Sequence, residues 1–206
     1  MIFEGFSVGP MESNCYILGC EKTLQAAVVD PGDEGHKILK RLEELKLKCT
    51  AIILTHGHVD HIGALKEVHS ATGASVMIHT EDADMLTNPS RNLSMFMGGN
   101  IKLKAADRLL NDGDTIEVGT VVIKVMHTPG HTRGGICLEA EGRLITGDTL
   151  FAGSIGRSDF PGGNHNQLIA SIKSRLLNYP PQTPVYPGHG PSSTIGSEIK
   201  YNPFLS

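Results

Sequence analysis

Three histidines and one aspartate fall within six residues of this chain, between positions 56 and 61. The stretch reads His-Gly-His-Val-Asp-His, and it follows an apolar run at 51–54 that is typical of a short strand. Neutral imidazole nitrogens bind zinc and iron, and a carboxylate completes a mixed nitrogen and oxygen site. Only ten of the 206 residues are histidines. The cluster therefore indicates a metal site more than a histidine-rich surface loop.

Other glycine-bearing turns carry a histidine or an aspartate directly after an apolar, strand-like run. They are Asp30-Pro31-Gly32, His127-Thr128-Pro129-Gly130-His131, Thr146-Gly147-Asp148 and Pro187-Gly188-His189. In layered α/β folds such strand ends gather at one rim, where ligands bind, and glycine lets the backbone turn sharply. Together the turns supply the candidate ligands His56, His58, Asp60, His61, His131, Asp148 and His189. Any one histidine has an alternative as a packed side chain, but the set suits two metal ions about 3.5–4 Å apart that share a carboxylate.

Strands alternate with amphipathic helices along the whole sequence. Strands are predicted at 3–8, 15–18, 26–29, 51–54, 75–78, 115–118, 121–126, 135–139, 143–146 and 185–186. Helices are predicted at 34–46, from Ile62 to the stop at Gly73, at 168–176 and near Ser197, with an irregular stretch at 85–100. No linker or low-complexity tract divides the chain. We therefore expect one domain over residues 1–206, with two similar halves and helices outside the sheets.

The composition is that of a soluble globular protein, with 39% hydrophobic and 19% charged residues and a net charge of -4. The absence of a dense Lys/Arg run argues against a nucleic-acid partner. No apolar stretch is long enough to cross a membrane, and the first residues do not resemble a secretory signal. The four cysteines form no CxxC pair. Reduced, buried thiols in a cytoplasmic protein are expected.

These motifs resemble those of the metallo-β-lactamase superfamily, and their order and spacing extend over nearly the whole chain. The resemblance implies an α/β (α+β) fold, a four-layer αββα sandwich with its metals at one edge. It also implies a division of the ligands. His56, His58 and His131 would hold the first metal, Asp60, His61 and His189 the second, and Asp148 would bridge.

Within the superfamily, residues 147–151, Gly-Asp-Thr-Leu-Phe, look like glyoxalase II, the hydroxyacylglutathione hydrolase, whereas many true β-lactamases carry a cysteine at the aspartate position. Residues 156–163 and 190–205 look like the short, single-domain bacterial glyoxalase II-like proteins. The chain departs from glyoxalase II in stopping at Ser206, without the C-terminal helical segment that supplies cationic contacts to glutathione. The physiological substrate therefore stays open.

The resemblance implies a binuclear metal-dependent hydrolase for thioesters such as S-lactoylglutathione, which acts by attack of a metal-bound hydroxide on the carbonyl. Asp60 and Asp148 are the catalytic candidates because they hold that hydroxide as well as the metals. Zinc is the expected metal, and iron and manganese suit the same donors. Arg157 is the candidate for an anionic substrate group, with pairing to Asp159 as its alternative.

Other assignments remain open on the sequence alone. Persulfide dioxygenases are similar in pattern but hold one iron, which His56, His131 and Asp148 would bind as a face of two histidines and one carboxylate. A nuclease would need a basic face that the sequence does not show. A non-catalytic metal-binding protein is a further alternative. Asp30 and Thr55 are expected to orient ligands or to serve only as turn residues, and residues 95–97 to form an apolar lid or ordinary loop packing.

Overall fold

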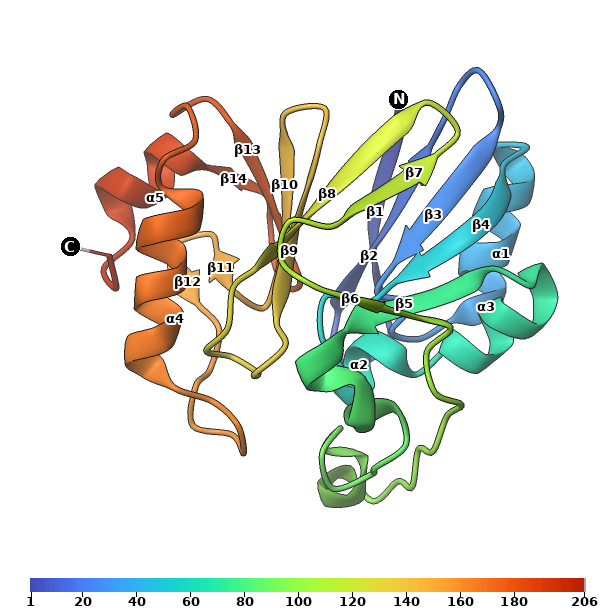
Figure 1. Cartoon of the computed structure of the whole chain (residues 1–206), viewed down its shortest axis with the longest axis horizontal. Helices are drawn as coiled ribbons and strands as arrows, with labels where there is room; N and C mark the ends of the chain where they lie inside the picture. The colour runs from blue at the N-terminus through green and yellow to red at the C-terminus, as the bar shows by residue number, and fades with distance from the viewer. Residues whose placement is uncertain (206) are drawn as a thin grey trace.

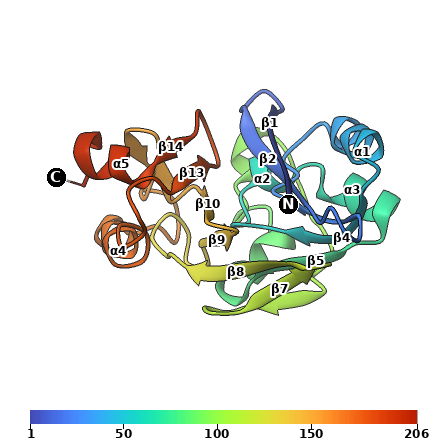
Figure 2. The same cartoon turned by 90° about the horizontal axis from the view of Figure 1, so that it is seen from above.

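The computed structural model, which describes residues 1–205, contains two six-stranded sheets packed face to face (Figures 1 and 2). The first sheet, in spatial order, is β1 (Ile2–Val8), β2 (Ser13–Gly19), β3 (Gln25–Val29), β4 (Lys48–Ile53), β5 (Ser75–His79) and β6 (Arg108–Leu110). The second is β14 (Ser193–Thr194), β13 (Pro184–Pro187), β10 (Arg143–Gly147), β9 (Ile136–Ala140), β8 (Val121–His127) and β7 (Thr115–Val118). A small hairpin of β11 (Leu150–Phe151) and β12 (Ser154–Ile155) follows β10.

Helices cover the outer faces of both sheets. The first sheet carries α1 (Gly35–Glu44) and α3 (Leu65–Thr72), and the second carries α4 (His165–Ser171) and α5 (Ile195–Tyr201) (Figure 2). The last turn of α4 continues as a π-helical segment, η3 (Ile172–Leu176). The short α2 (Val59–Ile62) and the 3₁₀ segments η1 (Thr80–Leu86) and η2 (Ser94–Met97) lie at the lower edge of the sandwich in Figure 1. No helix within residues 1–205 is long and apolar enough to cross a bilayer.

Three apolar clusters lie between the layers. They arise because side chains along each strand alternate between the two faces of its sheet. In β2, Ile17 packs with the helices of the first sheet, whereas the next residue, Leu18, packs between the sheets. In β9, Cys137 faces the helices of the second sheet and Leu138 faces the opposite sheet. Successive strand residues point to opposite faces, so each central strand contributes to two clusters. The expected four-layer αββα sandwich is confirmed.

The structure departs from the predicted helix at 62–73 by breaking it into α2 and α3. The backbone N–H of Ala64 donates to the carbonyl of Pro31 at 3.0 Å instead of extending α2. At Gly63, a Cβ would lie 2.3 Å from the carbonyl oxygen of Gly32. The helix is therefore interrupted where it passes close to the turn after β3. This contact between distant segments has no local sequence signal.

The strand ends meet because neighbouring strands at the centre of each sheet run parallel. β3 pairs with β4 in parallel, and β10 pairs with β13 in parallel. The carboxyl ends of parallel neighbours lie at the same edge, which is the ligand-binding edge of open α/β sheets. The turns singled out in the sequence are thus brought to one edge of the sandwich.

Candidate metal centre

All seven predicted ligands lie together at this edge, on loops or short elements from both sheets. The turn after β4 supplies His56 and His58, and α2 supplies Asp60 and His61. The loops after β8, β10 and β13 supply the other three, His131, Asp148 and His189. In Figure 1, α2 and the loop between β8 and β9 reach the lower edge of the sandwich from opposite halves.

The first group consists of His56, His58 and His131, which are all buried. One ring nitrogen from each lies within 4.8 Å of the others. His58 Nδ1 and His131 Nε2 are 2.9 Å apart. With Zn–N bonds of 2.0–2.1 Å, donors at two corners of a tetrahedral site would be about 3.3 Å apart. The imidazoles are therefore spaced closely enough to share one ion.

The second group consists of Asp60, His61 and His189. Asp60 Oδ2 lies 3.1 Å from His189 Nε2 and 3.4 Å from His61 Nε2. The two Nε2 atoms are 3.4 Å apart. These three separations form a nearly equilateral triangle, with edges close to those of a tetrahedral metal site.

The carboxylate of Asp148 lies between the two groups. Its Oδ2 is 3.5 Å from His131 Nε2, and its Oδ1 is 3.4 Å from His61 Nε2. Gly188 permits this approach, because a Cβ there would lie 2.1 Å from Asp148 Oδ1. Oδ2 is also 3.8 Å from His189 Nε2. The carboxylate thus lies next to nitrogens of both groups, which is the placement that a bridging carboxylate requires.

Two buried atoms show that these residues fit a metal. Within residues 1–205, His56 Nε2 and Asp148 Oδ1 are the buried side-chain polar atoms without a hydrogen-bond partner. Buried polar atoms are rarely left unpaired because each carries a desolvation cost of about 1–3 kcal/mol. Both atoms belong to the convergent set. A cation bound there would give each of them its missing partner.

Asp30 lies beneath both groups and orients a histidine of each. Its carboxylate accepts hydrogen bonds from Thr55 N at 2.7 Å, from Thr55 Oγ1 at 2.6 Å and from His61 Nδ1 at 3.0 Å. Since the Thr55 hydroxyl donates to Asp30, it accepts from His56 Nδ1 at 3.1 Å. Asp30 also lies near His56 and His61 in a metal-like group, but both of its oxygens are already engaged. It therefore holds the rings with Nε2 free.

Electrostatics keep three of the seven donors, His56, His58 and Asp148, in their metal-binding forms. Burial lowers the pKa of His56 far below its ordinary value, and burial with the neighbouring His131 lowers the pKa of His58 to about 3. Burial alone would raise the pKa of Asp148, but the adjacent imidazoles, led by His61, bring it well below its ordinary value. Metal binding requires neutral imidazoles and ionised carboxylates. His56 and His58 are thus neutral and Asp148 is charged. Burial would lower the pKa of His61 and His189, but the neighbouring carboxylates of Asp148 and Asp60 raise it, so that metal binding at these two rings displaces a proton.

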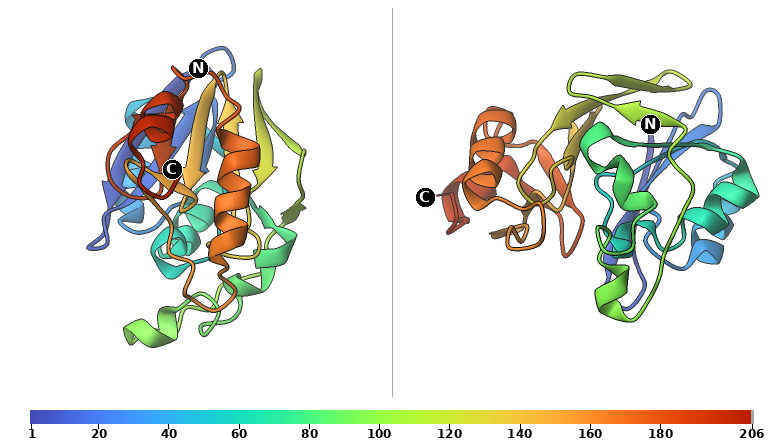
Figure 3. Two further views of the ribbon diagram at one scale, coloured as in Figure 1. Left: turned by 90° about the vertical axis from the view of Figure 1, so that its left-hand side faces the viewer. Right: turned by 60° about the horizontal axis from the view of Figure 1, so that its bottom comes forward.

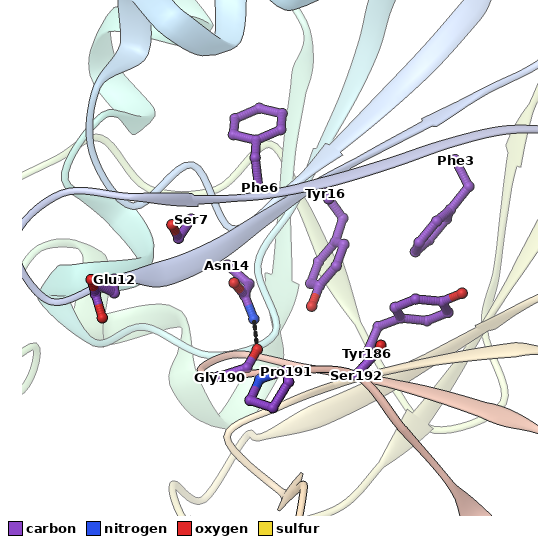
Figure 4. Close-up of a pocket in the computed structure, with 11 residues that line it drawn as sticks. Phe3, Phe6, Ser7, Glu12, Asn14, Tyr16, Tyr186, Gly190, Pro191 and Ser192 are labelled. Atoms are coloured by element: carbon purple, nitrogen blue, oxygen red, sulfur yellow. Dashed lines mark hydrogen bonds between the residues drawn. The ribbon is translucent and has the colours of Figure 1, made fainter.

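The amino end of β2 fixes the loop that carries His189. Asn14 Nδ2 donates to the carbonyls of Pro187 and Gly190, each at 2.9 Å, so that it spans the histidine. Figure 4 shows the bond to Gly190. Tyr16 Oη donates to the Pro187 carbonyl at 2.6 Å. Asn14 and Tyr16 also line a cavity of about 540 Å³ that borders the same loop (Figure 4). A strand of the first sheet thus positions a ligand of the second.

Two further buried residues, which the sequence analysis did not single out, support the ligand loops. Asp82 of η1 accepts hydrogen bonds from Thr132 Oγ1 at 2.6 Å and from Gly134 N at 2.7 Å. Both partners lie in the loop that directly follows His131. The Asn92 carbonyl accepts from Val59 N at 2.9 Å, at the start of α2. Neither residue has a local motif. Only the fold brings them to the site.

A cavity of about 660 Å³ opens onto the metal-binding groups. Its lining includes His58, Asp60, His131, Asp148 and His189. The remaining walls are apolar apart from one residue, and they comprise Met11, Val59, Leu93, Phe96, Met97, Phe151, Phe160, Pro161 and Arg157. Of the predicted lid at 95–97, Phe96 and Met97 line the cavity, whereas Met95 does not. The site can therefore admit a small molecule directly above the convergent donors.

Arg157 borders this cavity, but its guanidinium is paired. Nε and Nη2 donate to the two carboxylate oxygens of Asp159 at 3.0 and 2.8 Å, and the group lies 4.2 Å from the Phe160 ring centroid. The alternative pairing considered from the sequence is therefore present. The backbone carbonyl of Arg157 makes a separate contact, because it accepts a hydrogen bond from His131 Nδ1 at 2.6 Å.

Comparison with known proteins agrees with this geometry. The family model described as the metallo-beta-lactamase superfamily matches residues 8–189. The chain belongs to the metallo-β-lactamase superfamily. A relative named "Probable metallo-hydrolase YqgX" from Bacillus subtilis is 39% identical, covering 100% of this chain and 98% of its own. "Hydroxyacylglutathione hydrolase GloC" from Haemophilus influenzae is 35% identical, covering 100% and 99%.

Solved structures of this superfamily have the same fold. BLEG-1, described as a B3 metallo-β-lactamase, is 38% identical with a TM-score of 0.95, and each chain is covered completely. TTHA1623 in a di-iron-bound form is 36% identical with a TM-score of 0.87, covering 98% of this chain and 100% of its own. ETHE1 from Myxococcus xanthus is 32% identical with a TM-score of 0.83, covering 98% and 84%. The superfamily resemblance seen in the sequence is confirmed.

Proposed function

We propose that this metallo-hydrolase family member is a binuclear enzyme that hydrolyses thioesters, with zinc as its metal. The observation that carries the proposal is the position of the Asp148 carboxylate, which lies 3.5 Å from His131 of one donor group and 3.4 Å from His61 of the other. His56, His58 and His131 would hold one ion, and Asp60, His61 and His189 the other. The adjacent cavity leaves room for a substrate carbonyl above both ions.

When bound, two such ions lower the pKa of a coordinated water towards neutrality and polarise a carbonyl or a departing group. The protein's own part is to orient the reactants. The carboxylates of Asp60 and Asp148 line the cavity and accept hydrogen bonds from the attacking water, so they direct its lone pair towards the carbonyl. The lining contains no serine, threonine, cysteine or lysine among the described residues. Attack by water therefore needs no covalent intermediate with the chain.

The relatives support this choice in two ways. The name of GloC, at 35% identity over the whole chain, states hydrolysis of a hydroxyacylglutathione, which is a thioester. The name of YqgX states a metallo-hydrolase. The four cysteines are free and buried, which is in keeping with a reducing compartment, and we place the enzyme in the cytoplasm.

The test is steady-state hydrolysis of S-lactoylglutathione and of thioesters without glutathione by zinc-loaded protein, with elemental analysis of the same sample. A β-lactam and a phosphodiester serve as comparison substrates. We expect thioester turnover with two metals per chain. Asp148→Asn should lower the occupancy of at least one metal and reduce turnover strongly, because the neutral amide cannot replace a bridging carboxylate. Activity at the wild-type level in this variant would remove Asp148 from the site.

A second candidate is an iron-dependent dioxygenase acting on a persulfide. His131 and Asp148 lie 3.5 Å apart with His56 beside them, and two histidines with one carboxylate suit iron with open positions. The similarity to a di-iron-bound structure favours testing iron. Oxygen uptake by iron-loaded protein with glutathione persulfide discriminates the two. Stoichiometric uptake without thioester hydrolysis would replace the hydrolase proposal.

A further inference from the structure

The walls of the active-site cavity are almost entirely hydrocarbon. Apart from the metal-centre residues and Arg157, every lining side chain is apolar. Three of them, Phe96, Phe151 and Phe160, are aromatic. Such walls favour apolar groups, whose transfer out of water is favourable in proportion to the area that they bury.

Arg157, the one arginine or lysine among the described lining residues, is already paired. Arg157 forms a two-point ion pair with Asp159, whose carboxylate lies at 2.8 Å from Nη2. The guanidinium also lies over the ring of Phe160. The pair is exposed, so it contributes little to stability. Even so, it gives the cavity no excess positive charge beyond that of bound metals.

From this lining, and resting on the proposed function, we infer that the enzyme selects thioesters whose thiol part is apolar and uncharged, and that Phe96 and Met97 determine this selectivity. Glutathione is a tripeptide with charged ends and amides. Burying an amide without a hydrogen-bond partner is unfavourable. The lining side chains outside the metal centre offer such a group no partner except Arg157. An aliphatic or aromatic thiol would instead match the walls.

The segment that carries η2 provides a second observation. Phe96 and Met97 remain 72% and 57% exposed although they line the cavity. Both belong to η2. The green segment around η2 protrudes at the lower edge of Figure 1 and comes forward in the right view of Figure 3. Large apolar side chains left in water at the mouth of a cavity mark a binding surface. A bound apolar thiol would cover both side chains.

The test compares two thioesters of the same lactoyl group, one of glutathione and one of benzyl thiol. Both are assayed with zinc-loaded wild type, Phe96→Ser, Met97→Ser and Arg157→Gln. The matched control is Met95→Ser, which changes a neighbouring methionine that is 55% exposed but lies outside the cavity lining. Metal content and the unfolding midpoint are measured for every variant, so that a folding defect is recognised.

We expect wild type to show a higher kcat/KM for the benzyl thioester. Phe96→Ser and Met97→Ser should each lower that value by about tenfold, whereas Met95→Ser should leave it unchanged. Higher kcat/KM for S-lactoylglutathione, with loss of that preference in Arg157→Gln, would overturn the inference and leave the thioesterase proposal intact. A preference for the benzyl thioester that persists in both serine variants would remove Phe96 and Met97 as its determinants. Hydrolysis of neither thioester by the dimetal protein would instead refute the proposed function.

Discussion

One buried carboxylate connects the two halves of the metal centre at the scale of single residues. Asp30 accepts a hydrogen bond directly from His61. It also accepts one from the Thr55 hydroxyl, which in turn accepts a hydrogen bond from His56. His56 belongs to one donor group and His61 to the other. Partners of this kind fix the orientation and tautomer of metal-binding histidines, and their loss typically lowers metal affinity 10–100-fold.

Thr55→Val keeps the shape of the side chain but removes the hydroxyl between His56 and Asp30. We expect about tenfold weaker zinc binding, measured by competition with a chromophoric chelator. The matched control is Thr50→Val, which makes the same change in β4, the strand that precedes Thr55, where Thr50 Oγ1 donates only to the Ala26 carbonyl at 3.4 Å. Equal affinities in the two variants would show that the hydroxyl does not orient His56.

At the scale of elements, the amino end of β2 joins the two sheets at the site. Ser13 Oγ donates to the Asp60 carbonyl at 2.6 Å, and the backbone N–H of Asn14 donates to the Gly188 carbonyl at 2.7 Å. The Asn14 side chain then spans His189 from both sides. Backbone and side chain of one short segment therefore hold ligands of the second donor group.

Asn14→Ala removes both side-chain hydrogen bonds to the His189 loop. We expect weaker binding of one zinc ion per chain, with the other step unchanged, because His56, His58 and His131 do not depend on this contact. Isothermal titration of metal-free protein resolves the two steps. Asn178→Ala is the control, since Asn178 Nδ2 donates only to the Ser174 carbonyl, far from the site. Two unchanged binding steps in Asn14→Ala would refute its positioning role.

The start of η1 contains a titratable cap. His79 Nδ1 accepts from the backbone N–H of Glu81 at 3.2 Å, and its ring stacks on His127 with 4.0 Å between centroids. Burial lowers the pKa of His79, and the His127 imidazole lowers it further, against the opposing effect of nearby carboxylates. Protonation would remove the acceptor of the cap.

Because the pKa of His79 is lower in the folded than in the unfolded state, the unfolded chain binds the proton more readily. The free energy of unfolding should therefore fall as the pH drops below about 6.5. His79→Asn keeps a capping acceptor but cannot titrate, so its loss of stability between pH 7.5 and 5.5 should be smaller. Urea unfolding at each pH measures this difference. The matched control is His36→Asn, which removes a histidine at an exposed position of α1 and leaves the η1 cap in place. A loss of unfolding free energy in His79→Asn equal to that of wild type would contradict the account.

At the scale of the whole molecule, the convergence of the candidate ligands could be predicted because the signal of each is local. A glycine-bearing turn after an apolar strand already shows where His131 or Asp148 must lie. Sequence alone missed β6 because three residues, two of them exposed, show no clear alternation. It also missed Asn14, whose side chain contacts Pro187, 173 positions further along the chain. Contacts of that range depend on how the two sheets pack, which no short motif encodes.

The same packing explains why the centre is made of two halves. The turns after β3 and β4 come from one sheet, and those after β8, β10 and β13 come from the other. Each proposed ion has ligands from both, since His131 completes the first donor group and His189 the second. Bound metals would therefore hold the sheets together at this edge as well as serve the chemistry.

The central claim is tested most directly by the dependence of thioester turnover on metal stoichiometry. Metal-free protein is titrated with zinc, and the initial rate of lactoyl thioester hydrolysis is recorded against equivalents added. The account predicts that the rate rises until two equivalents are bound, because the Asp148 carboxylate requires an ion on each side to hold the attacking water. A rate that reaches its maximum at one equivalent, or that is already full without metal, would contradict it.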